Sequence, residues 1–325
     1  MNGEILSVSR LTVGYGEHPE AADVSFSLQK GEILCLVGES GCGKSTVLKA
    51  LLAAPEIRLF DGTITLEGQV ISELPDKERR ALCSEKMGIV FQSPEATFNP
   101  IRSYRKQFIE TLKSHGRYER AAFDGQVEQA FLKVELTDWK RVLNECPYAL
   151  SGGMNQRVAL ALALLLEQEI LLCDEPTSAL DATIQLQVAK ELKRLRDKNG
   201  VTQIIVTHNL ALARFLADHI GVMYAGRLVE LGRTADVLRE PRHPYTRSLI
   251  EAIPVLDGRM PVGLPGSPPM TGPSDTGCEF CERCPLAKED CAGRDYAMQQ
   301  VGDGHYASCC EAKQALQGER KEGTK

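Results

Sequence analysis

The chain has 325 residues, of which 43% are hydrophobic and 25% are charged, so it is long enough for one large globular domain and a small appendage. The net charge of −6 gives no electrostatic reason to expect nucleic-acid binding. No apolar run approaches the roughly 20 residues that span a bilayer, and the N-terminal segment lacks the basic and apolar regions of a signal peptide. We therefore expect a protein that is made and kept in the cytoplasm.

Apolar periodicity predicts several strands in residues 1–75. Residues 24–28 alternate between apolar and polar side chains, as in a half-buried strand, whereas residues 33–37 form the continuous apolar run of a strand buried on both faces. Ile64 and Leu66 alternate with polar residues before a turn at Glu67 and Gly68. This part of the chain is therefore predicted to form strands joined by tight turns.

The later parts of the chain predict helices and further strands. Residues 75–147 are highly charged with a helical pattern, which indicates a helical subdomain, and residues 151–220 return to helix–strand alternation with short apolar runs at 170–173 and 204–207. This order predicts a mostly parallel sheet with helices on its faces. Prolines and glycines in residues 254–277 predict an irregular linker, and the final polar residues are expected to fray.

A glycine-rich motif for phosphate binding follows the strand predicted at residues 33–37. It matches the pattern G-x-x-x-x-G-K-S/T in full and consists of Gly38, Glu39, Ser40, Gly41, Cys42, Gly43, Lys44, Ser45 and Thr46. The glycines let backbone N–H groups point at phosphate oxygens. Lys44 supplies a positive charge for the β- and γ-phosphates, and the Ser45 hydroxyl is a ligand for Mg²⁺. The motif requires no special role for the side chains of Glu39 and Cys42.

Two acidic residues follow the apolar run at residues 170–173. In phosphate-loop enzymes an acidic residue at this place orders Mg²⁺, a role that we assign to Asp174. Glu175 comes next and is predicted to polarise the attacking water as the general base.

Residues 150–154, LSGGM, precede a long apolar segment and resemble the signature of the ATP-binding cassette (ABC) ATPases. Other motifs of that family are present in the same order. Tyr15 lies where the family has an aromatic residue that stacks on adenine, and Gln92 matches the glutamine of the Q-loop. Residues 178–181 match the D-loop, and His208 matches the switch histidine.

The resemblance implies an α/β fold, namely an ABC-type P-loop NTPase with a mixed sheet core, an antiparallel β subdomain, a helical subdomain and a small C-terminal extension. Ser151, Gly152 and Gly153 begin a helix, and in this family they reach the γ-phosphate held by the other subunit, so ATP joins a dimer. By the same resemblance, Gln92 contacts Mg²⁺ or the attacking water. His208 then senses the γ-phosphate, because a neutral imidazole can both donate and accept a hydrogen bond.

Three stretches resemble one branch of the family, the oligopeptide/dipeptide/nickel importers. Residues 91–100, FQSPEATFNP, resemble its extended Q-loop, and residues 151–157 resemble its version of the signature. Residues 241–246, PRHPYT, resemble the start of its C-terminal extension. This resemblance implies the ATP-hydrolysing subunit of a peptide importer, with a nickel or nickel-chelate importer as the alternative and a soluble ABC ATPase as a remote one. Peptide-type members commonly carry a basic residue at the position of Asn155, and the change is expected to alter the contact between subunits.

The resemblance also implies a domain organisation and a set of partners. Residues 1–240 would form the nucleotide-binding domain, with its helical subdomain at about 76–150, and residues 241–325 the extension. The partners would be two transmembrane permeases, a second ABC ATPase that is identical or paralogous, and an external solute-binding protein, with no nucleic acid. The chain would then be a peripheral protein on the cytoplasmic side of the inner membrane.

Six of the eleven cysteines lie between Cys278 and Cys310, and such clustering in a cytoplasmic protein indicates a metal site before disulfides. Cys278, Cys284, Cys291 and Cys309 resemble the pattern that binds a 4Fe–4S cluster in some family members. The spacing from Cys278 to Cys284 also resembles that of ferredoxins, so Cys281 is a rival ligand. Zinc on four thiolates and a set of cysteines without metal are alternatives. A bound metal would stabilise the extension, which is too small to form a good hydrophobic core.

Overall fold

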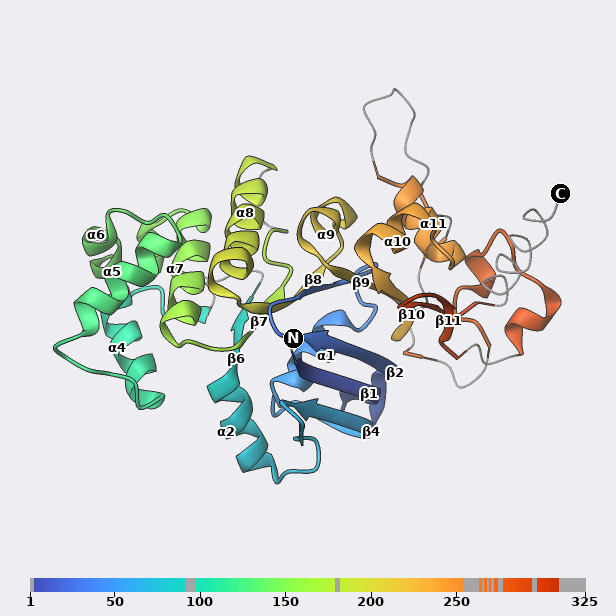
Figure 1. Cartoon of the computed structure of the whole chain (residues 1–325), viewed down its shortest axis with the longest axis horizontal. Coiled ribbons are helices and arrows are strands. Elements are labelled where there is room, and N and C mark those ends of the chain that lie inside the picture. Colours follow the sequence, from blue (N-terminus) through green and yellow to red (C-terminus); the bar gives the residue numbers. More distant parts are fainter. Residues whose placement is uncertain are drawn as a thin grey trace. The chain divides into compact units, whose positions relative to one another are not determined.

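A computed structural model describes residues 3–91, 97–178, 182–253, 263–264, 266–267, 269, 272–273, 277–293 and 297–309. The chain divides into two compact units, the first made of Met1–Arg80 with Val206–Lys325 and the second of Ala81–Ile205 (Figure 1). In the described ranges, no helix is both long and apolar enough to cross a membrane.

An antiparallel sheet of order β2-β1-β4-β5 lies in the first unit and is drawn in blue in Figure 1. Its strands are β1 (Glu4–Tyr15), β2 (His18–Gln29), β4 (Ile57–Leu66) and β5 (Gln69–Val70). Glu67 and Gly68 join β4 to β5 with φ values of 48° and 82°, the conformation that a two-residue hairpin turn requires. The strands predicted at residues 24–28 and 64–66, and the turn after them, are confirmed.

The first unit also contributes five strands to a mixed sheet, in the order β11-β12-β10-β9-β3. All five residues of β3 (Ile33–Val37) are buried, and β3 runs parallel to β9 (His219–Tyr224). Antiparallel pairing then joins β9 to β10 (Arg227–Arg233), β10 to β12 (His305–Ala307) and β12 to β11 (Gln299–Gly302). The strand predicted at residues 33–37 is confirmed, whereas the pair β11 and β12 has no counterpart among the predicted strands.

Four helices of the first unit pack on or beside these sheets. They are α1 (Lys44–Leu51), α9 (Leu210–Leu216), α10 (Thr234–Arg239) and α11 (Pro244–Glu251). Helix α1 contacts β1, β2 and β4, and α9 contacts β3. Helix α11 begins where Pro244 takes the first helical position and the His243 Nδ1 atom accepts a hydrogen bond from the Tyr245 N–H at 3.1 Å. The short 3₁₀ turns η2 (Cys281–Arg283) and η3 (Glu289–Ala292) follow later in the chain.

The second unit holds helices from two predicted parts of the chain. The charged segment gives α4 (Tyr104–Ser114), α5 (Phe123–Lys133) and α6 (Trp139–Asn144), and the 3₁₀ turn η1 (Pro147–Ala149) lies at its end. The helix–strand alternation gives α7 (Gly152–Leu165) and α8 (Ala182–Asn199). Strand β6 (Met87–Val90) runs parallel to β7 (Ile170–Asp174). Helix α2 (Asp76–Lys86) and strand β8 (Thr202–Thr207) cross the division between the units. The helices predicted in the charged segment and the strands at 170–173 and 204–207 are confirmed, but β6 interrupts the segment that was predicted to be helical.

A buried carboxylate ties the segment after residue 240 to the mixed sheet. Glu230 in β10 has no exposed surface. Its side chain accepts hydrogen bonds from the N–H groups of Arg242 and His243, both at 2.8 Å, and lies 2.7 Å from His305 Nε2. These contacts satisfy a carboxylate that would otherwise be costly to bury. They also attach both the start of the PRHPYT run and strand β12 to the Glu230 side chain.

Acidification is expected to weaken this region through His243. Burial lowers the pKa of His243 from 6.5 to about 4. The folded chain therefore keeps the imidazole neutral in a pH range where the unfolded chain protonates it. The stabilisation is complete above pH 6.5 and is lost as the pH falls to about 4, by up to about 3 kcal/mol. The measurement is the urea midpoint of unfolding at several pH values for the wild type and His243→Asn, whose oxygen can still cap α11.

The midpoint of His243→Asn should fall less steeply with acid than that of the wild type. His18 is exposed in β2, so His18→Asn is the matched control and should follow the wild type. Identical pH profiles for His243→Asn and the wild type would contradict this account of the buried imidazole.

Candidate nucleotide-binding site

The phosphate loop leaves the end of β3 and closes at the first residue of α1. Gly38 and Gly43 have φ values of 156° and 90°. A Cβ atom on Gly38 would lie 2.2 Å from the Met223 carbonyl oxygen, and one on Gly43 would lie 2.7 Å from the Glu20 carbonyl oxygen. Only glycine fits at both places, so the loop can pass close to the neighbouring backbone and direct its N–H groups at an anion before the N-terminus of α1.

Lys44 lies at the centre of this loop. Its side chain is only 4% exposed, and its Nζ atom donates to the carbonyl oxygens of Gly38 at 2.9 Å and Glu39 at 2.7 Å. The Nζ atom also lies 3.5 Å from the Cys42 Sγ atom, and burial raises the pKa of the Cys42 thiol, which favours its neutral form. The positive charge of Lys44 is therefore held where the phosphates of a nucleotide would bind. On binding, its hydrogen bonds to the loop carbonyl oxygens would be replaced by hydrogen bonds to phosphate oxygens.

Gly43→Ala is expected to abolish ATP binding, because the added methyl group would meet the Glu20 backbone and the loop would have to move. Gly68 is a matched control, since its φ of 82° is similar but nothing lies within 4 Å of an added Cβ atom. Gly68→Ala should cost only about 1–2 kcal/mol of stability from the left-handed backbone. The measurement is titration with a fluorescent ATP analogue, and equal affinity in the two variants would contradict the prediction.

Tyr15 is the last residue of β1 and keeps an exposed face. Its side chain is 37% exposed, and its hydroxyl oxygen accepts a hydrogen bond from Lys49 Nζ at 3.3 Å. Lys49 belongs to α1, the helix that begins at the phosphate loop. The ring therefore stands beside that helix with surface available for stacking, as the prediction of an adenine contact requires.

His208 is exposed at the end of β8, directly after six buried residues. The next residue, Asn209, caps α9 by accepting a hydrogen bond from the Leu212 N–H at 3.1 Å. Helix α9 contacts β3, the strand that leads into the phosphate loop. The elements that carry His208 and the loop are thus neighbours within the first unit.

Asp174 and Glu175 end a buried strand in the second unit. Asp174 is the last residue of β7, and both acidic side chains are half-buried. Glu175 has a φ of 46°, a left-handed conformation that is unfavourable for a residue with a side chain. Its carbonyl oxygen accepts hydrogen bonds from the N–H and the hydroxyl of Ser178, at 3.2 and 3.3 Å, which supports the turn that presents the two acids.

The signature segment forms the exposed N-terminus of α7, also in the second unit. Ser151 caps the helix by accepting a hydrogen bond from the Met154 N–H at 3.4 Å, and Ser151 and Gly152 are exposed. Asn155 lies one turn into the helix and is only 3% exposed. Its side chain accepts from the Tyr104 hydroxyl at 2.6 Å and donates to the Pro147 carbonyl oxygen at 3.1 Å. Asn155 is therefore used inside the unit, which argues against its expected role in a contact between subunits.

Some predicted residues lie outside the described part of the chain, namely Gln92, most of the D-loop and Cys310. Two residues that contact the loop were given no role at the nucleotide site from the sequence. Arg283 and Tyr245 both contact Glu39, the loop residue to which no role was given. No local pattern linked them to the loop, because they follow Glu39 by more than 200 positions.

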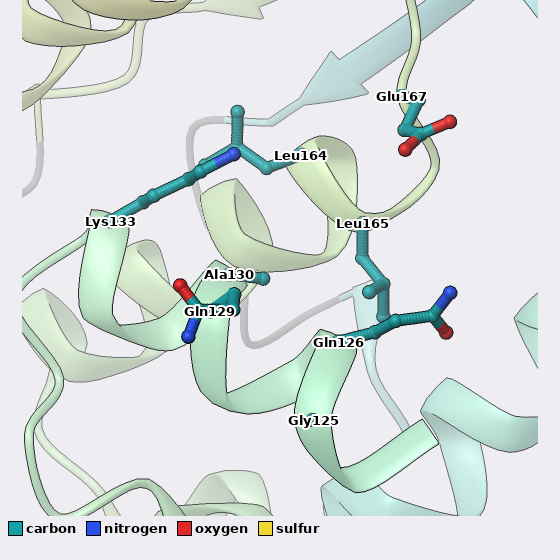
Figure 2. Close-up of a pocket in the computed structure, with 8 residues that line it drawn as sticks. All are labelled: Gly125, Gln126, Gln129, Ala130, Lys133, Leu164, Leu165 and Glu167. Carbon is teal, nitrogen blue, oxygen red and sulfur yellow. The ribbon is translucent and has the colours of Figure 1, made fainter. Parts of the chain in front are cut away.

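Two surface pockets contain none of the predicted nucleotide-site residues. One, of about 300 Å³, lies between α5 and α7 and is lined by Gly125, Gln126, Gln129, Ala130, Lys133, Leu164, Leu165 and Glu167 (Figure 2). The other, of about 240 Å³, is lined by residues of β10, α10, β11 and β12, with Arg233 and Asp303 on its wall. Neither pocket identifies the nucleotide site, which is instead defined by the backbone geometry of the phosphate loop and by Lys44.

The described cysteines of the extension do not form a metal centre. The Cys278 N–H donates to the Cys291 carbonyl oxygen at 2.8 Å, and Cys309 packs against the small apolar cluster of Val301 and Ala307. Among the described residues, no group of three His, Cys, Asp or Glu side chains is arranged to hold a metal ion. The prediction of an iron–sulfur or zinc site therefore has no support in this part of the chain.

The arrangement of a buried parallel strand, a glycine loop closed around a lysine and a following helix defines a P-loop nucleotide-binding protein. Residues 21–178 match the ABC transporter family, and residues 229–291 match the C-terminal region of oligopeptide/dipeptide transporters.

Relatives cover almost the whole chain. The dipeptide transport ATP-binding protein DppD of Bacillus subtilis (strain 168) is 36% identical over 316 residues, 94% of each chain. The oligopeptide transport ATP-binding protein OppD of Escherichia coli (strain K12) is 36% identical over 321 residues, 96% of this chain and 94% of the relative. The solved ATP-binding cassette MJ0796, dimeric and bound to ADP and Pi, matches with a TM-score of 0.61 and 26% identity over 71% of this chain and 99% of that chain. The chain belongs to the ABC transporter family and is an ABC ATPase.

Proposed function

We propose that the chain is the ATP-hydrolysing subunit of an importer that energises the uptake of peptides across the cytoplasmic membrane. The observation that carries the proposal is the match of residues 229–291 to the C-terminal region of oligopeptide/dipeptide transporters, in addition to the cassette itself. Relatives of nearly equal length are named for dipeptide and oligopeptide transport. These findings favour peptides over nickel as the transported solute.

The proposed organisation follows from this assignment. Residues 1–240 form the nucleotide-binding domain, and residues 241–325 form the extension that begins at the PRHPYT run. The extension is not a separate appendage in the sheet topology, because β12 pairs with β10. We propose that residues on both sides of position 240 act together on ATP.

The proposed chemistry assigns one role to each predicted residue. Lys44 and the loop N–H groups hold the phosphates, and Tyr15 stacks on adenine. Ser45, Gln92 and Asp174 would hold Mg²⁺, and the hydroxyl, amide and carboxylate oxygens they offer are the hard ligands that this ion prefers. Bound Mg²⁺ would neutralise the charge of the phosphates. Glu175 takes the proton of the attacking water, and His208 senses the γ-phosphate.

The proposed assembly contains two ATPase subunits. The exposed N-terminus of α7, with Ser151 and Gly152, is suited to bind an anion held by a facing subunit. The second ATPase is identical or paralogous, and two transmembrane permeases would receive the chain at the cytoplasmic face of the inner membrane. An external solute-binding protein would deliver the peptide to them. A 4Fe–4S cluster has no part in this proposal, and iron and sulfide analysis of anaerobically purified protein tests for it.

Purification from detergent-solubilised membranes, with partners identified by mass spectrometry, tests the transport assignment. The expected result is recovery of two multi-spanning permeases, with or without a second ATPase. Uptake of labelled di- and oligopeptides and of nickel by cells with and without the chain then tests the solute. Recovery of ribosomal or nucleic-acid-binding proteins without a permease would contradict the assignment, and uptake of nickel alone would contradict the choice of peptides.

A further inference from the structure

Glu39 in the phosphate loop is held by residues from the extension. Its carboxylate accepts two parallel hydrogen bonds from the Arg283 guanidinium, at 2.7 and 3.0 Å. Its backbone N–H donates to the Tyr245 hydroxyl at 3.0 Å, and its carbonyl oxygen accepts from Lys44 at 2.7 Å. The N–H, the carboxylate and the carbonyl oxygen of this residue are therefore all engaged, two of them by residues beyond position 240.

Arg283 is fixed in place by its surroundings. It ends the η2 turn, between Cys281 and Cys284, and its side chain is only 6% exposed. The guanidinium also donates to the Tyr224 hydroxyl at 3.2 Å and stands 5.6 Å from the centre of the Tyr224 ring. A bidentate, largely buried arginine–carboxylate pair is a strong and geometrically specific contact, so Arg283 limits where Glu39 can lie.

Tyr245 is held equally firmly. It is fully buried, and its ring centre lies 4.7 Å from that of Tyr224 and 5.4 Å from that of Phe280. These three residues form what we call the aromatic cluster, to which β9, α11 and the turn before Cys281 each contribute one ring. The ion pair between Arg227 and Glu279, at 2.6 Å, fastens that turn to β10. The Tyr245 hydroxyl that contacts the phosphate loop is therefore held in place by the packing of its ring.

We propose that Arg283 and Tyr245 are positioning residues for ATP, which hold the phosphate loop in its nucleotide-receiving shape and neutralise the Glu39 carboxylate. Glu39 lies beside Gly38, and its carbonyl oxygen accepts a hydrogen bond from Lys44, the residue that meets the phosphates. An uncompensated carboxylate at this place would repel the nucleotide. The docked extension thereby sets the affinity of this subunit for ATP. The inference rests on nucleotide binding by the loop and does not depend on the transported solute.

ATP binding and docking of the extension are thermodynamically linked. If the docked extension favours ATP binding, ATP must favour the docked extension by the same factor. Backbone amides of residues 278–291 should then exchange with deuterium more slowly when ATP is bound, including the Arg283 N–H, which donates to the Phe280 carbonyl oxygen at 3.0 Å.

The test measures KM for ATP and kcat in the full chain for Tyr245→Phe, Arg283→Gln and the double variant Glu39→Gln/Arg283→Gln. Tyr245→Phe keeps the aromatic cluster and removes only the acceptor of the Glu39 N–H. Arg283→Gln should raise KM about tenfold or more, and Tyr245→Phe several-fold, with kcat at saturating ATP changed by less than about twofold. The double variant removes the repelling charge and should recover most of the KM.

Arg233→Gln is the control, because Arg233 is an exposed arginine of the first unit that pairs with Asp303 at 2.7 Å. It should leave KM unchanged. A merely structural role of Arg283 predicts that the double variant is at least as impaired as the single one, and that result, or unchanged KM in both single variants, would overturn the inference. Absence of ATP hydrolysis in the wild type would instead contradict the proposed function.

Discussion

Glu175→Gln is expected to lower the rate of ATP hydrolysis by about 10²- to 10⁴-fold, the usual contribution of a general base. Glutamine has the same shape as glutamate, but its amide cannot take a proton from the attacking water. Glu175 is half-buried at the end of β7 and held with a φ of 46°. Strain of this kind persists where the surrounding structure fixes a functional side chain. The affinity for ATP should change little, because the proposed contacts to the phosphates are made by the loop and Lys44.

Phosphate release under single-turnover conditions and titration with a fluorescent ATP analogue separate the two effects. Glu167→Gln is the matched control, since Glu167 also has a left-handed φ of 51° and its side chain is 84% exposed. It should hydrolyse ATP at the wild-type rate. Wild-type turnover by Glu175→Gln would refute its role as the base, and loss of ATP binding would show that the residue acts on the nucleotide rather than on water.

The phosphate loop could be predicted from the sequence because its geometry is local. Five consecutive apolar residues, 33–37, identify a strand buried on both faces, and the positions of Gly38, Gly43 and Lys44 within nine residues fix the turn and the charge. The acidic pair at the end of β7 and the serine cap of α7 are local in the same sense, since each stands at one end of a regular element.

Features that depend on distant residues could not be predicted in this way. Strand β6 has only four residues inside a charged segment and is defined by its pairing with β7, about 80 positions later. The three-residue strand β12 exists because it pairs with β10. Asn155 is explained only by its hydrogen bonds to Tyr104 and Pro147. Periodicity carries no information about any of these partners.

The ion pair between Arg283 and Glu39 could not be predicted for the same reason, since 244 positions separate the two residues. The phosphate-binding pattern leaves the position of Glu39 unspecified, because the backbone there satisfies the motif with many side chains. In this chain the side chain at that position is a contact between the loop and the extension. The PRHPYT run, which the sequence linked only to a branch of the family, acquires a physical role through the Tyr245 hydroxyl.

Lys44→Met is expected to raise the Kd for ATP at least about 30-fold, which corresponds to the lower end of the roughly 2–5 kcal/mol lost when one partner of a buried charge pair is removed. Methionine fills a similar volume but cannot donate to the phosphates or to the carbonyl oxygens of Gly38 and Glu39, which Lys44 contacts at 2.9 and 2.7 Å. Both the ligand and the loop therefore lose a partner. Saturating ATP should restore hydrolysis only in part, because Lys44 is also assigned to the γ-phosphate that is transferred.

The measurement is isothermal titration with ATP and Mg²⁺, with Lys77→Met as the control, because Lys77 is exposed in the first turn of α2. That variant also removes one positive charge, so a general effect of net charge would weaken both proteins equally. We expect wild-type affinity in Lys77→Met. Thermal unfolding without nucleotide should remain cooperative in both variants, which would show that each of them is folded. Wild-type affinity in Lys44→Met would mean that the loop N–H groups and the N-terminus of α1 hold the phosphates without the lysine, and the assignment of Lys44 would then be wrong.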